Sequence, residues 1–368
     1  MVNKVSLQQV NRFLFCGVLV IGILHFAREI LVPVTFAIFF AMLFAPLCNK
    51  MEKGGLNRTV SSLLSVLILI IASLGVLLVV FLQGRQLADQ YPTIEKKSQE
   101  FLKKSQNYVS EKLNVPEQKQ DEVINKKMKE MMDSSGNAIK KVITGIAGTI
   151  GKIVIVIIFT FLFLLQRDKY EAFFLQLSAQ ENNPDAAKRM ISGISTVASS
   201  YLAGRAISIV IFFVLFGIGF LIVGLQSALL MALIASLLTI VPYIGPILGG
   251  VLPFALALVT GDSTNVALGT LIVVLVVNAI DNYLIEPYVI GGQVSISAFF
   301  TILILLVGGI VWGVAGVVLF LPMLGVVKII FDSVPDLRPY GFLIGDQREQ
   351  KPADLLKKIK GLFRKKKE

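Results

Sequence analysis

Residues 227–259 read SALLMALIASLLTIVPYIGPILGGVLPFALALV, a block of 33 residues without a charged side chain. A straight helix of that length spans about 50 Å, whereas the hydrocarbon core of a bilayer is about 30 Å thick. The block is therefore either one long broken helix or a pair of short arms that turn back. Residues 299–331 form a second block of equal length with a single lysine, and they present the same choice.

The middle of the first block carries helix-breaking residues, Pro242-Tyr243-Ile244-Gly245-Pro246. Pro246 has no N–H to donate and its ring clashes with the preceding turn, so the helix must break near it. Irregular backbone at membrane depth is tolerated only where it is buried or lines a cavity, and many transporters build their sites from such breaks. We therefore expect a hinge at Pro242, Tyr243, Gly245 and Pro246, with a simple packing kink as the alternative.

The composition excludes most soluble functions. The chain has 368 residues, of which 55% are hydrophobic and 16% charged, against about 45–50% and about 25% in soluble proteins. One histidine and two cysteines, Cys16 and Cys48, argue against a metal cluster or a disulfide framework. No nucleotide-binding or hydrolase motif is present. We expect no enzyme, no catalytic residue, no cofactor and no metal. The net charge of +11 lies largely beside apolar segments, where it reports topology rather than nucleic-acid binding.

The apolar segments predict an all-α integral membrane protein. Beside the two long blocks, the spans are expected at residues 13–27, 30–48, 60–82, 142–166, 206–223 and 265–285. Counting each long block once gives eight crossings, and counting both as hairpins gives ten. The basic tail and the basic loop around Lys50, Lys53 and Arg58 belong in the cytoplasm by the positive-inside rule. Both counts are even, so both termini are expected in the cytoplasm.

These segments divide the chain into six parts. They are an N-terminal membrane part with three spans (1–83), a polar amphipathic helical segment outside the cytoplasm (84–141), the fourth span (142–166), a cytoplasmic amphipathic segment (167–205), a C-terminal membrane part (206–331) and a basic cytoplasmic tail (332–368). The polar segment is expected to break near Pro116.

Polar residues inside an apolar span are the strongest candidates for a transport site. Asn278, Asp281 and Asn282 follow a spacing of i, i+3 and i+4, so they share one face of an α-helix. Ionisable groups within a span are costly and usually face a cavity. Asp281 with two amides suits a cation, a proton or a polyhydroxylated solute. Glu286 comes next, before Pro287, where the helix is expected to end; the alternative is that both carboxylates only mark the helix end.

Glycines dominate the last block, at Gly308, Gly309, Gly313 and Gly316. Their spacing approximates the small-xxx-small pattern that lets helices approach closely. Close packing is the favoured interpretation, and a moving gate is the alternative.

These motifs together resemble one family. Val241-Pro242-Tyr243-Ile244-Gly245-Pro246 is similar to the (I/V)PYIGP signature of the autoinducer-2 exporter (AI-2E) family of bacterial permeases. The similarity extends over residues 10–331, including Ser200–Arg205, Ile280-Asp281-Asn282 and the glycines up to Pro322. Two positions depart from the family pattern. Asn57-Arg58 stands in place of a Pro-Arg pair, and Ser297-Ala298 in place of a His-Pro pair, which removes a histidine that a mechanism could need.

The resemblance implies a multi-pass permease of the cytoplasmic membrane. Members of the family are associated with export of autoinducer-2, a small polar quorum-sensing signal, or with exchange of sodium or lithium for protons. Three hypotheses follow: secondary transport of a small polar solute driven by an ion gradient, Na⁺(Li⁺)/H⁺ antiport, and an uncoupled oligomeric pore or scaffold. The expected partners are membrane lipid, the solute or ions, and further copies of the chain.

Overall fold

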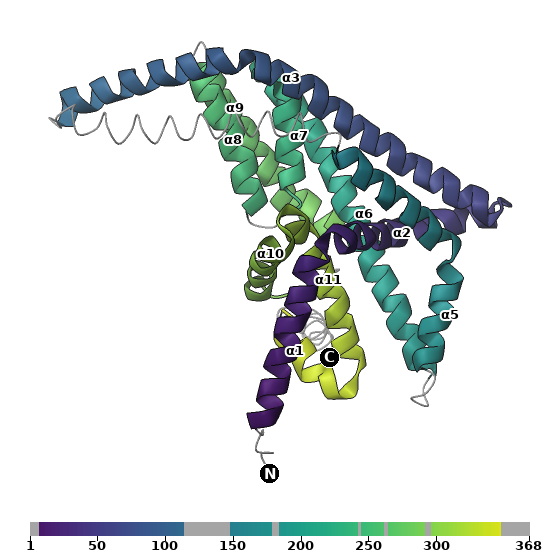
Figure 1. Ribbon diagram of the computed structural model, residues 1–368. Helices are drawn as coiled ribbons and strands as arrows, with labels where there is room; N and C mark the ends of the chain where they lie inside the picture. The colour runs from purple at the N-terminus through teal and green to yellow at the C-terminus, as the bar shows by residue number, and fades with distance from the viewer. Residues whose placement is uncertain are drawn as a thin grey trace, which may run out of the picture. The chain divides into compact units, whose positions relative to one another are not determined.

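The computed structural model describes residues 7–113, 148–178, 184–241, 244–260, 264–290 and 296–346. These residues are helical almost throughout, as Figure 1 shows, so the protein is an all-α membrane protein. Within the described ranges no strand forms, and the one extended pairing is an isolated bridge between Ile296 and Gly345.

The described part of the chain is a succession of helices. In chain order they are α1 (Leu7–Phe26), α2 (Arg28–Lys53), α3 (Arg58–Leu113), an unlabelled helix (Gly148–Leu165), α5 (Arg167–Ser178), α6 (Pro184–Val223), α7 (Ala228–Leu238), α8 (Ile244–Thr260), α9 (Thr264–Ile280), the π-helix η2 (Asp281–Ile290), α10 (Ala298–Trp312), α11 (Val314–Ser333), the 3₁₀ turn η3 (Pro335–Leu337) and α12 (Arg338–Ile344).

Six helices among the described residues are long and apolar enough to cross a membrane. They are Arg28–Lys53, Arg58–Gln86, Gly148–Leu165, Lys188–Val223, Asn265–Ile285 and Val314–Ser333. Two of the eight expected spans are not among these six: α1, of which Gly17–Phe26 counts as a shorter apolar helix among the described residues, and the block at residues 227–259, which forms the two shorter helices α7 and α8. The chain is thus a multi-pass membrane protein.

Each 33-residue block is a hairpin of two helices packed against each other, α7 with α8 and α10 with α11. Of the two alternatives, the structure thus shows the pair of arms and not one long broken helix, and the number of crossings stays a prediction. In the second block, Gly313 forms the turn with φ 60° and ψ −139°, a conformation open to glycine but strained for other residues. At about 1.5 Å per residue, α7, α8 and α10 are about 16, 26 and 22 Å long, which is shorter than the hydrocarbon core.

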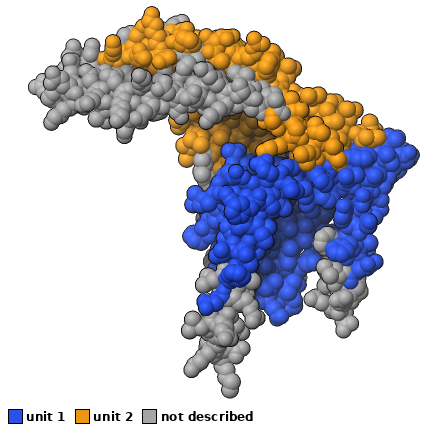
Figure 2. Space-filling view, in the orientation of Figure 1, with its two compact units in different colours: residues 1–62, 159–203, 290–368 blue, residues 63–158, 204–289 orange. Residues whose placement is uncertain are grey.

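The chain divides into two compact units, which Figure 2 shows in blue and orange. Unit 1 comprises residues 1–62, 159–203 and 290–368, and unit 2 comprises residues 63–158 and 204–289. Each unit has its own apolar core. In unit 1 the core gathers around Trp312 and Phe320. In unit 2 it gathers around Phe212, Phe216 and Phe220 of α6, which pack with residues of α7, α8 and α9.

The helix α3 is longer than its apolar span. It begins after Asn57, whose side-chain oxygen accepts a hydrogen bond of 2.8 Å from the backbone N–H of Val60, the usual geometry of an N-cap. The helix then continues through Pro92 to Leu113. The expected boundary between residues 83 and 84 is therefore a change of composition within one helix, and the expected break at Pro116 lies outside the described residues.

Candidate functional site

The α7–α8 hairpin places two backbones in close contact at the glycines of α8. A Cβ on Gly249 would lie 3.1 Å from the carbonyl oxygen of Ala235, and a Cβ on Gly245 would overlap the carbonyl of Leu238. Gly245 and Gly249 are four residues apart, so they share one face of α8. The hydroxyls of Ser236 and Thr239 donate hydrogen bonds to backbone carbonyls within α7, which satisfies them inside an apolar arm.

The expected hinge falls at the turn of this hairpin. The helix α7 ends at Leu238, and the backbone N–H of Gly245 donates to the carbonyl of Val241 at 2.9 Å, which opens α8. Pro246 is half-buried in the first turn of α8. Pro242 and Tyr243 lie outside the described residues. Among the described residues, the helix thus stops after Leu238 and a new helix begins at Ile244, and the role of this stretch as a hinge stays a prediction.

The candidate ion-binding residues lie where α9 changes into a π-helix. Asn278 belongs to α9, and Asp281 is the first residue of η2. Both are half-buried, and the Oδ1 atom of Asp281 is shielded from solvent, whereas Asn282 is exposed. Asn278 thus lies in an α-helix and Asp281 and Asn282 in a π-helix, so the three do not belong to one regular α-helix, and their common face stays a prediction. Short π-helices are rare and are frequently found at functional sites.

The helix also continues past the proline at which it was expected to end. Glu286 and Pro287 both belong to η2, which extends to Ile290. A π-helix has wider turns than an α-helix, which relieves the clash between the proline ring and the carbonyl four residues before it. The backbone of Glu286 thus lies in a helix, and its side chain falls outside the described part of the structure.

The hairpin turn and Asp281 lie at the same end of one helix pair. The helices α8 and α9 pack together and are joined by residues 261–263 only, so they run antiparallel. A Cβ on Gly250 would meet Cγ1 of Val274 at 2.6 Å, which fixes their register. Gly245 comes five residues before Gly250 in α8, and Ala279 comes five residues after Val274 in α9. Because the two helices are antiparallel, Gly245 and Ala279 lie at the same level. Val277 and Ile285, four residues on either side of Asp281, belong to the core of unit 2.

The glycines of the last block lie in unit 1, within the α10–α11 hairpin. A Cβ on Gly308 would lie 2.5 Å from the carbonyl oxygen of Gly316, and a Cβ on Gly316 would overlap the carbonyl of Gly308. Gly309 is less confined, because its nearest neighbour would be Cγ2 of Val317 at 3.4 Å. Trp312 then ties the hairpin to α1 by donating from Nε1 to the carbonyl oxygen of Leu24 at 2.8 Å. These contacts are typical of two helices, α10 and α11, whose backbones pack closely against each other.

A family model described as AI-2E family transporter matches residues 14–336, almost nine-tenths of the chain. The chain belongs to the AI-2E transporter family. It is therefore a membrane transporter, and its family comprises transporters rather than enzymes. No curated protein matches the chain.

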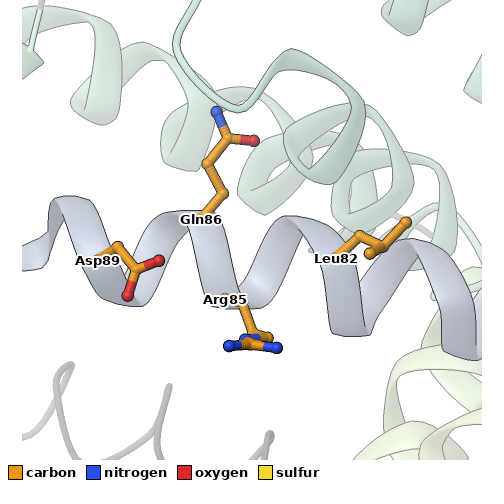
Figure 3. A pocket seen from close by; sticks show the side chains of 4 residues that line it. All are labelled: Leu82, Arg85, Gln86 and Asp89. Atoms are coloured by element: carbon orange, nitrogen blue, oxygen red, sulfur yellow. The ribbon is translucent and has the colours of Figure 1, made fainter.

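One depression of the transporter follows α3 at the end of its apolar span. It has a volume of about 380 Å³ and is lined by Leu82, Arg85, Gln86 and Asp89. Figure 3 shows that the side chains of Gln86 and Arg85 point in different directions from the helix. The guanidinium of Arg85 lies 5.5 Å from the ring centre of Phe81. These polar groups therefore do not converge on one point, and they form no ligand site by themselves.

An ion-pair network that the sequence did not predict connects three segments of unit 1. Arg167 pairs with Glu52 near the end of α2 and lies 4.0 Å from a carboxylate oxygen of Asp168. Arg58, at the start of α3, pairs with Asp168 at 2.5 Å. The hydrogen bond from Arg58 lowers the pKa of Asp168, burial opposes this shift, and the charges of Arg58 and Arg167 add to the lowering. The network therefore fixes the helix ends on either side of the loop at residues 54–57.

Among the residues that the structure describes, no three His, Cys, Asp or Glu side chains gather in one place. A monovalent cation at Asp281 would have to rely on backbone carbonyls and amide oxygens, as cation sites at broken helices commonly do.

Proposed function

We propose that this transporter moves a small polar solute across the cytoplasmic membrane by secondary transport, with Asp281 as the residue that couples transport to an ion gradient. The observation that carries the proposal is the half-buried position of Asp281, at a change of helix type beside the core of unit 2. Ionisable groups are costly in such surroundings and are usually retained for function. The start of α8, at the same end of the α8–α9 pair, supports a site between Asp281, Asn278 and the hairpin turn.

The family supports a solute of the autoinducer-2 type, which is small, polar and rich in hydroxyl groups. An asparagine amide and a carboxylate both bind hydroxyl groups, through donated and accepted hydrogen bonds. Asn282, which is exposed, and Glu286 extend the candidate pathway along η2. The same proposal places both termini in the cytoplasm, since hairpins in both blocks leave the parity of the crossings unchanged.

A second candidate function is Na⁺(Li⁺)/H⁺ antiport through the same carboxylate. The favouring observation is that Asp281 Oδ1 is shielded from solvent, because a carboxylate within a membrane span is a common site for a proton or a cation in ion-coupled transporters. An uncoupled oligomeric pore or scaffold is the third candidate, and it requires no carboxylate in the pathway.

The test is solute uptake into proteoliposomes that contain the purified full-length protein. Autoinducer-2 uptake is measured with and without an imposed proton or Na⁺ gradient, for the wild type, Asp281→Asn and the control Asp332→Asn. Asp332 is a suitable control because it already pairs with Lys328 on α11, outside the candidate site. The proposal expects gradient-driven uptake by the wild type and the control, and none by Asp281→Asn. An uptake rate that is the same with and without each ion gradient would favour the uncoupled pore instead.

A further inference from the structure

A groove in the first turns of α6 combines positive charge with hydroxyl groups. It has a volume of about 560 Å³ and is lined by Lys188, Arg189, Ser192, Gly193, Thr196 and Val197. This volume falls within the range of about 300–1,000 Å³ that small-molecule sites occupy. The two cationic side chains and the two hydroxyl-bearing residues are all exposed. We infer that this groove binds the phosphate group of an anionic phospholipid.

The polar groups form a single row on the helix. Lys188, Ser192 and Thr196 follow one another at intervals of four residues, so they project from one face of α6. Arg189 and Gly193 form the neighbouring row. A phosphate group accepts charge-assisted hydrogen bonds from arginine and lysine, and arginine engages it with two parallel N–H groups. The two hydroxyls extend the row of donors along the helix in the direction of the membrane.

The length of α6 places the groove at the level of the lipid headgroups. The apolar helix extends from Lys188 to Val223, 36 residues. From Lys188 to Val223 the helix is about 52 Å long, against about 40–45 Å for a bilayer with both headgroup layers. With a tilt of about 30°, inside the range that membrane helices adopt, α6 reaches from one headgroup layer to the other, and its turns from Lys188 onward begin among the phosphates.

The neighbouring helix α11 borders the groove and carries a carboxylate whose charge is compensated. A Cβ on Gly193 would lie 3.6 Å from Cγ2 of Ile329, so α11 borders α6 beside the groove. Asp332 follows Ile329 by one turn of α11 and pairs with Nζ of Lys328 at 2.7 Å. Its negative charge is thus balanced within α11. Basic sites between membrane helices at the cytoplasmic face are a recognised way of binding anionic headgroups.

The test is native mass spectrometry of the full-length protein in detergent. Phosphatidylglycerol and phosphatidylcholine with identical acyl chains are titrated, and the bound lipids are counted. The inference expects tighter binding of phosphatidylglycerol by the wild type. The double variant Lys188→Gln/Arg189→Gln should lose about 5-fold in affinity for each charge removed, or about 30-fold in all. Ser192→Ala/Thr196→Val should show a smaller loss in the same direction.

A matched control removes the same charge from another exposed site at the expected cytoplasmic face. Lys50→Gln/Lys53→Gln, at the end of α2, should leave phosphatidylglycerol binding unchanged. Circular dichroism confirms that all variants remain folded. Three results would overturn the inference: equal affinity of the wild type for both lipids, an equal loss in both double variants, or displacement of the lipid by inorganic phosphate, which would assign the groove to a free anion.

Discussion

At the scale of single residues, the contacts of glycines decide how the hairpins close. Gly308 and Gly309 are adjacent in α10, yet only Gly308 faces the backbone of α11 at Gly316. In a membrane, where helices gain little from the hydrophobic effect, such close approach is what holds two apolar helices together. The two glycines therefore form a natural pair of test and control positions.

Gly308→Ala should destabilise the protein, because the added methyl group would press on the carbonyl of Gly316. Overpacking of this kind costs about 1–3 kcal/mol. Gly309→Ala should be neutral or slightly stabilising, since alanine favours a helix over glycine. Thermal unfolding in detergent is measured by the fluorescence of Trp312, the single tryptophan of the chain, whose ring packs against Phe320 in the same hairpin. Equal melting temperatures for the two variants would contradict the packing described.

Asp168 gives a prediction for the dependence of stability on pH. Arg58 lowers the pKa of this carboxyl in the folded protein, so its contribution is complete above the pKa of the unfolded chain and is lost as the pH falls through the folded value. The side chain is 71% exposed, and the pair is thus worth no more than about 1 kcal/mol.

We expect Asp168→Asn to melt slightly below the wild type at pH 7, and the gap to close below about pH 4. Melting temperatures at a series of pH values measure it, and Arg58→Gln should reproduce the same loss at neutral pH. A gap that persists or widens in acid would show that the ion pair is not its cause.

At the scale of elements, each of the two 33-residue apolar blocks forms a hairpin of two helices. The length of an apolar block alone is equally compatible with one long helix. The N-terminus of α10 and the end of α12 lie together, because the backbone N–H of Ser297 donates to the carbonyl of Ile344 at 2.9 Å. The helix α12 packs on α11. Both ends of the block at residues 299–331 therefore lie on one side of the α10–α11 pair.

Single cysteines at Ser297 and Ser333 should react with a membrane-impermeant thiol reagent from the same side of the membrane. The background protein carries Cys16→Ser and Cys48→Ser. Right-side-out and inside-out vesicles separate the two faces, and both cysteines should be labelled in the same preparation. Labelling of the two cysteines in opposite preparations would show that the block at residues 299–331 crosses the membrane once.

The sequence predicted the helical class, the membrane setting and the family, because long uncharged segments and a local motif carry that information directly. It left the hairpins open, since an apolar block looks the same whether it continues or reverses. The π-helix at Asp281 was missed because a shift in backbone hydrogen bonding has no period of its own in a short segment. The ion pair of Arg167 with Glu52 joins residues 115 positions apart, a separation that no local pattern reveals.

At the scale of the whole molecule, the membrane helices expose most of their surface. The share of each span that is buried within the chain ranges from 11% for Gly148–Leu165 to 33% for Val314–Ser333. Lipid covers part of that surface in a membrane, and further copies of the chain are a second way to cover it. The low burial of the span Gly148–Leu165 makes this helix the first candidate for a contact between copies.

We expect a homo-oligomer, measured as a mass of several chains by light scattering in detergent after correction for bound detergent. Placing an arginine on the exposed face, with Ile155→Arg, should reduce that mass, because a charge in an apolar contact is costly. The exposed Ile222, at the end of α6, provides a control substitution away from this helix. A monomeric wild type would contradict the prediction and would mean that lipid alone covers the exposed surface of the membrane helices.

The most direct test of the account is proton movement in proteoliposomes that contain a pH-sensitive dye. A Na⁺ or Li⁺ gradient is imposed on the wild type, Asp281→Asn and Asp332→Asn, and the measurement is then repeated with autoinducer-2 on one side. The account predicts proton flux by the wild type and by Asp332→Asn, dependent on the cation or on the solute, and no such flux by Asp281→Asn. Equal proton flux by all three proteins, or no flux under any gradient, would contradict the role of Asp281 as the coupling residue.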